Sequence, residues 1–229
     1  MGILEIGSNG SRPKTQAAAG LVRRPTGADY CQSIFAHLNG SKALLRTLGV
    51  TSCRGREGVS SVASGLANAA AAEGKKVLLV DANPDRAALH RAYRSKDRPG
   101  LCDILAERAS LQEAIQRVGK SSLSLLPAGR PGPRLLWQAD EALCSRLLEA
   151  VRTGFDVLVW DLPPVNRPAF PGHLAALLDG VVWVMTAGRV SAAAAAEAKQ
   201  RMESLHLHLL GIVLNRASRC RPANGFTRR

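Results

Sequence analysis

A ten-residue segment rich in glycine and serine is the first candidate for chemistry. Residues 52–61 read SCRGREGVSS and join an apolar stretch, predicted as a strand, to an alanine-rich stretch, predicted as a helix. A tight loop that opens a helix leaves backbone N–H groups unpaired, and the helix dipole adds positive potential, so such a loop binds anions. The segment therefore predicts a phosphate-binding loop. Its candidate nucleotide-binding residues are Arg54, Gly55, Glu57, Gly58, Ser60 and Ser61.

Two positions of this loop decide what it could do with a nucleotide. Ser60 stands where the serine or threonine of a phosphate-binding loop holds Mg²⁺. Val59 stands where the lysine of such loops reaches the β- and γ-phosphates. Because valine carries no ammonium group, one full positive charge beside the transferred phosphoryl group is missing. Binding of a phosphate could survive this loss, whereas its transfer should be strongly weakened.

Two aspartates at the ends of apolar stretches are the candidate metal ligands and catalytic residues. Asp81 closes the stretch 76–80, and Asp161 closes the stretch 155–160. An apolar strand that ends in aspartate is the usual form of the element that holds Mg²⁺ in nucleotide-binding domains. With Ser60, these two carboxylates make up the predicted Mg²⁺ site. Either aspartate alone could instead be a helix cap or a turn residue.

Six apolar stretches alternate with helical patterns along the chain. Strands are expected at 44–52, 76–80, 122–126, 155–160, 181–185 and 209–214, and the longer helices at 29–38, 60–73, 141–153 and 192–205. Ser110 and Glu113 have the spacing of a helix-capping box. Apolar strands that alternate with helices predict an α/β fold, with a parallel sheet covered by helices on both faces. Ligands of such sheets bind at the carboxyl ends of the strands, where the loop and both aspartates fall.

Composition sets the domain boundaries and narrows the class of protein. The 229 residues allow one domain, expected at 28–217, between a flexible basic leader at 1–27 and a basic tail at 218–229. No apolar run approaches the length of a membrane span, and the five cysteines form no CxxC pair, so a reduced, cytoplasmic protein is expected. The formal charge of +13 attracts phosphate-rich partners, although basic ends are more often solvated tails.

Several blocks of the sequence, taken together, resemble the bacterial tyrosine kinase (BY-kinase) domains of capsule and exopolysaccharide export, which belong to the deviant Walker group of P-loop ATPases. The resemblance covers about residues 29–217. Its blocks are VTS at 50–52, LVDAN at 79–83, GLCDIL at 100–105, LLPAG at 125–129, DLPP at 161–164 and GIVLNR at 211–216. It implies ATP or ADP with Mg²⁺ as the ligand. It also makes Asn215 and Arg216 candidates for contact with the base, the alternative being a turn at the end of a strand.

The chain departs from that family at several positions. Val59 replaces the phosphate-binding lysine, Arg56 replaces a loop glycine, and Asn83 replaces the second acid of an Asp-x-Asp element. Arg54 falls where related partition-type ATPases carry a signature lysine and could supply a substitute cation, or could be a solvated surface residue. The residues at 224–229 contain no tyrosine cluster for self-phosphorylation, and residues 29, 32 and 35 do not keep the family's ring-forming Glu-x-x-Arg-x-x-Arg pattern.

Three functions remain open at this point. The leading hypothesis is a degenerate, pseudokinase-like subunit of exopolysaccharide synthesis or export. Its implied partner is a membrane-embedded polysaccharide co-polymerase that regulates chain length, which would hold it at the inner face of the inner membrane. The second is an active ATPase or protein-tyrosine kinase that uses a substitute cation. The third is a partition-like ATPase that binds DNA or membrane, although the LPAG and DLPP blocks favour the polysaccharide branch and argue against nucleic acid. A homo-oligomer is compatible with all three.

Overall fold

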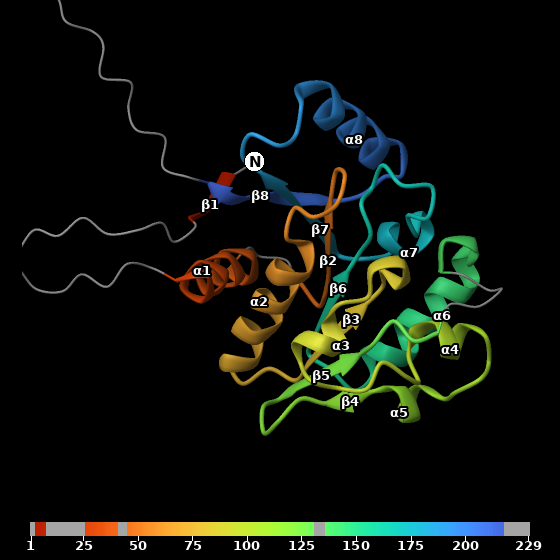
Figure 1. Ribbon diagram of the computed structural model, residues 1–229. Coiled ribbons are helices and arrows are strands. Elements are labelled where there is room, and N and C mark those ends of the chain that lie inside the picture. Colours follow the sequence, from red (N-terminus) through yellow and green to blue (C-terminus); the bar gives the residue numbers. More distant parts are fainter. Residues whose placement is uncertain (1–2, 8–25, 41–44, 131–135, 218–229) are drawn as a thin grey trace, which may run out of the picture.

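One twisted sheet forms the centre of the molecule, between two groups of helices (Figure 1). The computed structural model describes residues 3–7, 26–40, 45–130 and 136–217. Within these ranges the sheet has eight strands in the order β1-β8-β7-β2-β6-β3-β5-β4. The strands are β1 (Ile3–Gly7), β2 (Thr47–Ser52), β3 (Val77–Asp81), β4 (Gln116–Arg117), β5 (Leu123–Leu126), β6 (Val157–Asp161), β7 (Gly180–Thr186) and β8 (Leu209–Ala217).

The α/β architecture is confirmed, with one correction to the predicted sheet. All described pairs of strands are parallel except β4 with β5, which is antiparallel and pairs only two residues of each strand. The sheet is therefore mixed and mostly parallel. The two-residue strand β4 carries too short a pattern to stand out in the sequence, and it forms because β5 offers an edge to pair with.

Strand β1 corrects the expectation of an irregular leader at 1–27. Residues 3–7 pair in parallel with β8, and Ile3 lies opposite Ile212. The partner strand is about two hundred residues away in the chain, so nothing in the local sequence could indicate this pairing. The other residues of the expected leader, at 1–2 and 8–25, the tail at 218–229, and residue 44 of the predicted strand lie outside the described residues, as do residues 41–43 and 131–135.

One face of the sheet is covered by α1 (Gly27–Gly40), α2 (Val59–Ala72) and α3 (Leu89–Ala92). Alternate residues of each strand point to this face, as expected from the two-residue period of a strand. Val77 and Leu79 of β3 pack here with Val157 and Val159 of β6. The small residues of α2 allow it to lie close to the sheet, and the helix begins directly after the 52–58 segment.

The opposite face is covered by α4 (Leu101–Leu105), α6 (Glu141–Arg152), α7 (Gly172–Ala176) and α8 (Ala192–Ser204). Leu78 and Val80 of β3, together with Leu158 and Trp160 of β6, point to this side. Layers on both faces leave the ends of the strands as the accessible parts of the sheet (Figure 1). The described helices include none with the length and apolar character needed to cross a membrane.

Several short elements were not expected from the sequence. They are η1 (Pro84–Arg86), α3, η2 (Leu136–Gln138) and α7, whereas the short helix α5 (Leu111–Ala114) follows the capping box expected at Ser110 and Glu113. Helices of three to five residues are too short to form on their own, so their position depends on tertiary contacts. In α5, the predicted capping box is present, because the Ser110 hydroxyl accepts from the Glu113 N–H and the Glu113 carboxylate accepts from the Ser110 N–H.

Candidate nucleotide-binding site

The predicted site residues meet at the carboxyl ends of three neighbouring strands. Strand β6 lies between β2 and β3, so that Asp81 at the end of β3 is level with Asp161 at the end of β6. On its other side, β6 pairs Asp161 with Val50 of β2. The loop that follows β2 therefore starts beside both aspartates and then enters α2 (Figure 1). This juxtaposition confirms the expectation that strand ends would bring the three motifs together.

The loop between β2 and α2 turns through three residues with left-handed backbone angles. Gly55, Arg56 and Gly58 have φ angles of 99°, 62° and 92°. Glycine adopts such angles without strain, whereas arginine does so at a cost. Gly58 also has no room for a side chain, because a Cβ there would overlap the side-chain amide of Asn215. The loop is thus held in a compact conformation at the N-terminus of α2.

This conformation leaves an array of hydrogen-bond donors free. Within the described chain, no hydrogen bond uses the backbone N–H groups of residues 56–61. The preceding two N–H groups, of Arg54 and Gly55, donate to the Glu57 carboxylate at 3.0 and 3.3 Å. Glu57 is only 3% exposed and so acts as an internal support of the loop. The free donors at the start of a 14-residue helix have the arrangement expected of an anion cradle.

A cavity of about 430 Å³ lies over this cradle. Its volume is in the range of pockets that hold small ligands. The loop and the start of α2 line one side, the segments after β3 and β6 line another, and the ends of β7 and β8 complete the wall. The lining residues are Ser52, Gly55, Arg56, Gly58, Val59, Ser60, Ser61, Asn83, Arg86, Leu162, Pro164, Arg189 and Arg216.

Val59 borders this cavity but packs mainly into the protein. Its side chain is 9% exposed and belongs to the hydrophobic layer under α1 and α2. A valine here stabilises the start of α2 by burying apolar surface. The position that would carry the phosphate-binding lysine therefore contributes packing and no charge.

Asp161 is the carboxylate best placed to hold a metal ion. It is 1% exposed, and its Oδ1 is buried without a hydrogen-bond partner. Burial and the nearby charge of Asp81 raise the pKa of Asp161 to about 8, although a hydrogen bond with the Ser60 side chain lowers it. A free carboxylate oxygen next to a serine hydroxyl matches the oxygen ligands that Mg²⁺ takes from proteins beside phosphate groups. Ser60 and Asp161 thus fit a bound Mg²⁺.

Asp81 has a different setting. Its Oδ1 accepts from the Asn83 N–H at 3.2 Å, and its Oδ2 accepts from the N–H groups of Ala88 and Leu89 at 3.2 and 3.3 Å. Burial raises the pKa of Asp81, and these hydrogen bonds act in the opposite direction. The carboxylate therefore holds the segment between β3 and α3 through backbone N–H groups, which agrees with the turn role stated above as the alternative for an isolated aspartate. Asp81 lies opposite Asp161 on the neighbouring strand β6.

The other predicted site residues divide into two groups. Gly55, Gly58, Ser60, Ser61 and Arg216 line the cavity, as does Asn83. Arg54 and Glu57 do not line it; Arg54 is exposed outside, and Glu57 is turned into the loop. Asn215 uses its side-chain Nδ2 to donate to the Glu57 carbonyl at 2.9 Å. Asn215 therefore holds the loop from the end of β8.

Sequence reasoning missed three arginines that line the cavity. Arg56 was noted only as a lost glycine, and Arg86 and Arg189 received no role. All three lie in segments that follow strands β2, β3 and β7. The rule that ligands bind beyond the carboxyl ends of strands could have pointed to them, but the rule does not say which loop side chains turn inward.

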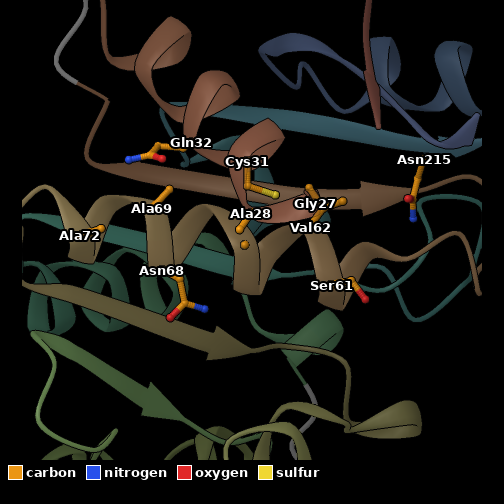
Figure 2. Close-up of a pocket in the computed structure, with 11 residues that line it drawn as sticks. Gly27, Ala28, Cys31, Gln32, Ser61, Val62, Asn68, Ala69, Ala72 and Asn215 are labelled. Atoms are coloured by element: carbon orange, nitrogen blue, oxygen red, sulfur yellow. The ribbon is translucent and has the colours of Figure 1, made fainter. Parts of the chain in front are cut away.

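A second cavity, of about 520 Å³, lies between α1 and α2. Figure 2 shows Cys31 of α1 facing the small residues of α2, with Ser61 and Asn215 at one end. The helices approach so closely that a Cβ on Gly65 would overlap the Cys31 sulfur. Ser61 borders both cavities. The lining of the second cavity is mostly apolar and carries no charged side chain among the described residues.

Comparison with known proteins confirms the resemblance to the kinase family. Residues 45–219 match the family model of the cellulose biosynthesis protein BcsQ. The tyrosine-protein kinase CpsD of Streptococcus agalactiae is 30% identical over 191 residues, which cover 83% of this chain and 83% of that protein. The succinoglycan biosynthesis transport protein ExoP of Rhizobium meliloti is 31% identical over 187 residues, which cover 78% of this chain and 23% of ExoP.

Solved structures share the fold. The kinase domain of Escherichia coli tyrosine kinase ETK aligns with a TM-score of 0.77 at 24% identity, over 85% of this chain and 79% of that domain. The septum site-determining protein MinD of Pyrococcus horikoshii, complexed with Mg-ADP, aligns with a TM-score of 0.64 at 22% identity, over 77% of this chain and 72% of MinD. These likenesses establish a P-loop NTPase-type fold. The chain belongs to the BcsQ family of P-loop domains and is a relative of the tyrosine-protein kinase CpsD.

Proposed function

We propose that this chain is a subunit of exopolysaccharide or capsule synthesis that binds ATP or ADP as a structural or switching ligand and transfers little or no phosphate. The observation that carries the proposal is the cavity at the 52–61 loop. Its cradle of free N–H groups supports binding of a phosphate chain, while Val59 occupies the lysine position. Relatives whose names refer to cellulose and succinoglycan biosynthesis support the polysaccharide pathway.

Loss of the lysine should affect transfer more than binding. Phosphoryl transfer depends on charges aimed at the transition state, and removal of one such group costs on the order of a thousandfold in rate. Binding also draws on the backbone N–H groups, which do not depend on the side chain at position 59. The proposal is therefore that nucleotide binding is kept while phosphoryl transfer is lost.

Ser60 and Asp161 would hold Mg²⁺, and Asp81 would stay beside it as a supporting carboxylate. When bound, the metal would neutralise charge on the β- and γ-phosphates. In the absence of ligand, Ser60 and Asp161 satisfy one another only in part, since the Asp161 Oδ1 remains without a partner. Loss of the Asp161 carboxylate should therefore weaken any part of the affinity that depends on Mg²⁺.

A membrane-embedded polysaccharide co-polymerase is the proposed partner. ExoP is a transport protein of which this chain matches less than a quarter, so its remaining length holds other parts. We infer that the present chain supplies the nucleotide-binding domain that acts with such a protein. It would then act at the cytoplasmic face of the inner membrane through that partner.

An active tyrosine kinase or ATPase is the second candidate, and one observation favours it. Four arginines line the cavity and could supply the charge that Val59 lacks. Steady turnover of Mg-ATP that disappears in Asp161→Ala would support this candidate. Absence of turnover at saturating Mg-ATP, with and without a co-polymerase, would exclude it.

Calorimetric titration with Mg-ADP and Mg-ATP tests the leading proposal. We expect saturable binding in the micromolar range by the wild-type chain. Weaker binding by Asp161→Ala would place the ligand at the predicted strand ends. A wild-type chain that binds neither nucleotide at millimolar concentration would overturn the proposal. Circular dichroism of both proteins would establish that they are equally folded.

A further inference from the structure

Four arginines from four different segments are among the residues that line the cavity. Arg56 comes from the loop after β2, Arg86 from the segment after β3, Arg189 from the segment after β7, and Arg216 from the end of β8. Arg86 lies over the loop, since its Nη1 is 3.6 Å from the position of a Cβ on Gly55. Among the described residues, ion pairs involve other arginines and lysines. The four guanidinium groups therefore have no carboxylate partner in this part of the chain.

The nearby carboxylates are not among the residues that line the cavity. Glu57 accepts the N–H groups of Arg54 and Gly55 inside the loop. Asp81 accepts three backbone N–H groups from its own segment. Asp161 forms a hydrogen bond with the Ser60 side chain and is 1% exposed. Within the described residues, no acidic side chain belongs to the cavity wall, so the positive potential of the arginines is not offset at the surface that a ligand would touch.

One buried polar group of the wall also lacks a partner. The Ser52 hydroxyl is fully buried, borders the cavity and makes no hydrogen bond with the described protein. A buried hydroxyl without a partner is costly and is normally satisfied by water or a ligand. Together with the free N–H groups of residues 56–61, it adds to an environment rich in donors.

We propose that these arginines bind the phosphate chain of the ligand directly, so that a nucleoside diphosphate or triphosphate binds here without Mg²⁺. This inference rests on the proposed nucleotide-binding function and defines how that site works. A guanidinium group donates two parallel hydrogen bonds to a phosphate and keeps its charge at any physiological pH. Two or more guanidinium groups can supply the positive charge that a lysine and a metal ion supply in other phosphate-binding loops. Mg²⁺ can still bind at Ser60 and Asp161 and add modestly to the affinity, but it is not required for binding.

The chemistry that this wall recognises is a chain of at least two phosphates. Such a chain is present in ADP and ATP and also in inorganic pyrophosphate. ADP and pyrophosphate are therefore used as separate probes. If ADP binds at least about tenfold more tightly, a difference of about 1.4 kcal/mol, the nucleoside contributes and the site is a nucleotide site. Equal affinity would assign the site to inorganic polyphosphate and would overturn the nucleotide part of the proposal.

The test is a calorimetric titration of ADP in EDTA and in excess Mg²⁺. We expect less than about a tenfold loss of affinity on removal of Mg²⁺. Arg56→Gln and Arg86→Gln should each weaken ADP binding about tenfold in EDTA, as expected for loss of a hydrogen bond to a charged group. The matched control is Arg201→Gln, on the exposed surface of α8, which should leave the affinity unchanged. Thermal unfolding of each variant shows whether it remains folded.

The outcomes separate this inference from the function on which it rests. Binding of ADP only in the presence of Mg²⁺ would overturn the inference and leave the nucleotide-binding function in place. If a folded Arg56→Gln, Arg86→Gln double variant binds ADP as tightly as the wild type, the inference is also overturned and the nucleotide-binding function again stays in place. If the wild-type chain binds no nucleotide with or without Mg²⁺, both are wrong.

Discussion

The side-chain amide of Asn215 donates a hydrogen bond to the carbonyl oxygen of Glu57 at a distance of 2.9 Å. This contact joins the end of β8 to the loop between β2 and α2 across 158 positions of the chain. The same carbonyl accepts a longer bond, of 3.4 Å, from the Thr186 hydroxyl at the end of β7. The conformation of the loop is thus set by two neighbouring strands as well as by its own residues.

Replacement of Asn215 by alanine should loosen the loop. Loss of one hydrogen bond to a partly buried carbonyl should lower the free energy of unfolding by about 1 kcal/mol. The control is Asn68→Ala, which removes an exposed amide bonded to Tyr93 and to the Ser64 carbonyl but does not touch the loop. Urea unfolding measures the stability of both variants, and ADP titration should show weaker binding for Asn215→Ala alone. Equal ADP affinity in the two variants would contradict the role given to Asn215.

Gly58 should tolerate alanine less well than another glycine with a similar backbone angle. Gly58 and Gly74 have φ angles of 92° and 80°, so alanine is strained at both. Only at Gly58 does the new Cβ meet another group, the amide of Asn215, whereas at Gly74 the space is open. Gly58→Ala should therefore destabilise the protein by at least about 1 kcal/mol more than Gly74→Ala. Similar unfolding midpoints for Gly58→Ala and Gly74→Ala would contradict the close approach of Asn215 to Gly58.

The buried carboxyl of Asp161 predicts a dependence of stability on pH. Its pKa of about 8 in the folded protein lies above the value of about 3.9 for a free aspartate. The folded state therefore holds a proton that the unfolded state has released, and stability should fall as the pH rises from about 4 to about 8, by at most about 1.4 kcal/mol per pH unit. Urea unfolding at pH 5 and pH 8 should show a smaller decrease for Asp161→Asn than for the wild type. An equal decrease would contradict the raised pKa.

Lysine at position 59 should restore part of the missing chemistry. Val59→Lys returns an ammonium group to the position from which P-loop lysines reach the β- and γ-phosphates. We expect Val59→Lys to hydrolyse ATP faster than the wild type. Val59→Met provides a side chain of similar reach without charge, and it should stay as slow as the wild type. A wild-type rate equal to that of Val59→Lys would mean that another cation already acts.

Arg54 and Arg56 allow a direct comparison of the cation expected from the sequence with the one that lines the cavity. Arg54 is exposed and does not border the cavity, whereas Arg56 does. Arg56→Gln should weaken ADP binding more than Arg54→Gln does. If Arg54→Gln weakens ADP binding more than Arg56→Gln does, Arg54 is the substitute cation.

The sequence predicted the parts of this fold that depend on local patterns. The capping box of Ser110 and Glu113 is a local feature, and the meeting of Asp81 and Asp161 follows from a general property of parallel sheets. Strand β1 could not be predicted, because its pairing depends on β8 at the other end of the chain.

The composition of the cavity wall was also only partly predictable. Residues whose backbone forms the cradle, such as Gly58 and Ser60, are fixed by the loop and line the cavity as expected. Long side chains are not fixed in this way. Arg56 has a left-handed backbone angle, and the side chain of Arg86 lies over Gly55. These are properties of the folded loops that a reading of residue types does not reveal.

The fate of bound ATP tests the central claim most directly. The wild-type chain would be incubated with Mg-ATP and separated rapidly from free nucleotide, and the nucleotide that stays with the protein would be identified and counted. The account predicts about one nucleotide per chain, still present as ATP. Protein recovered without nucleotide would contradict the binding function. Steady conversion to ADP, or transfer of the γ-phosphate to a tyrosine, would contradict the proposal that this chain binds nucleotide without using its phosphate.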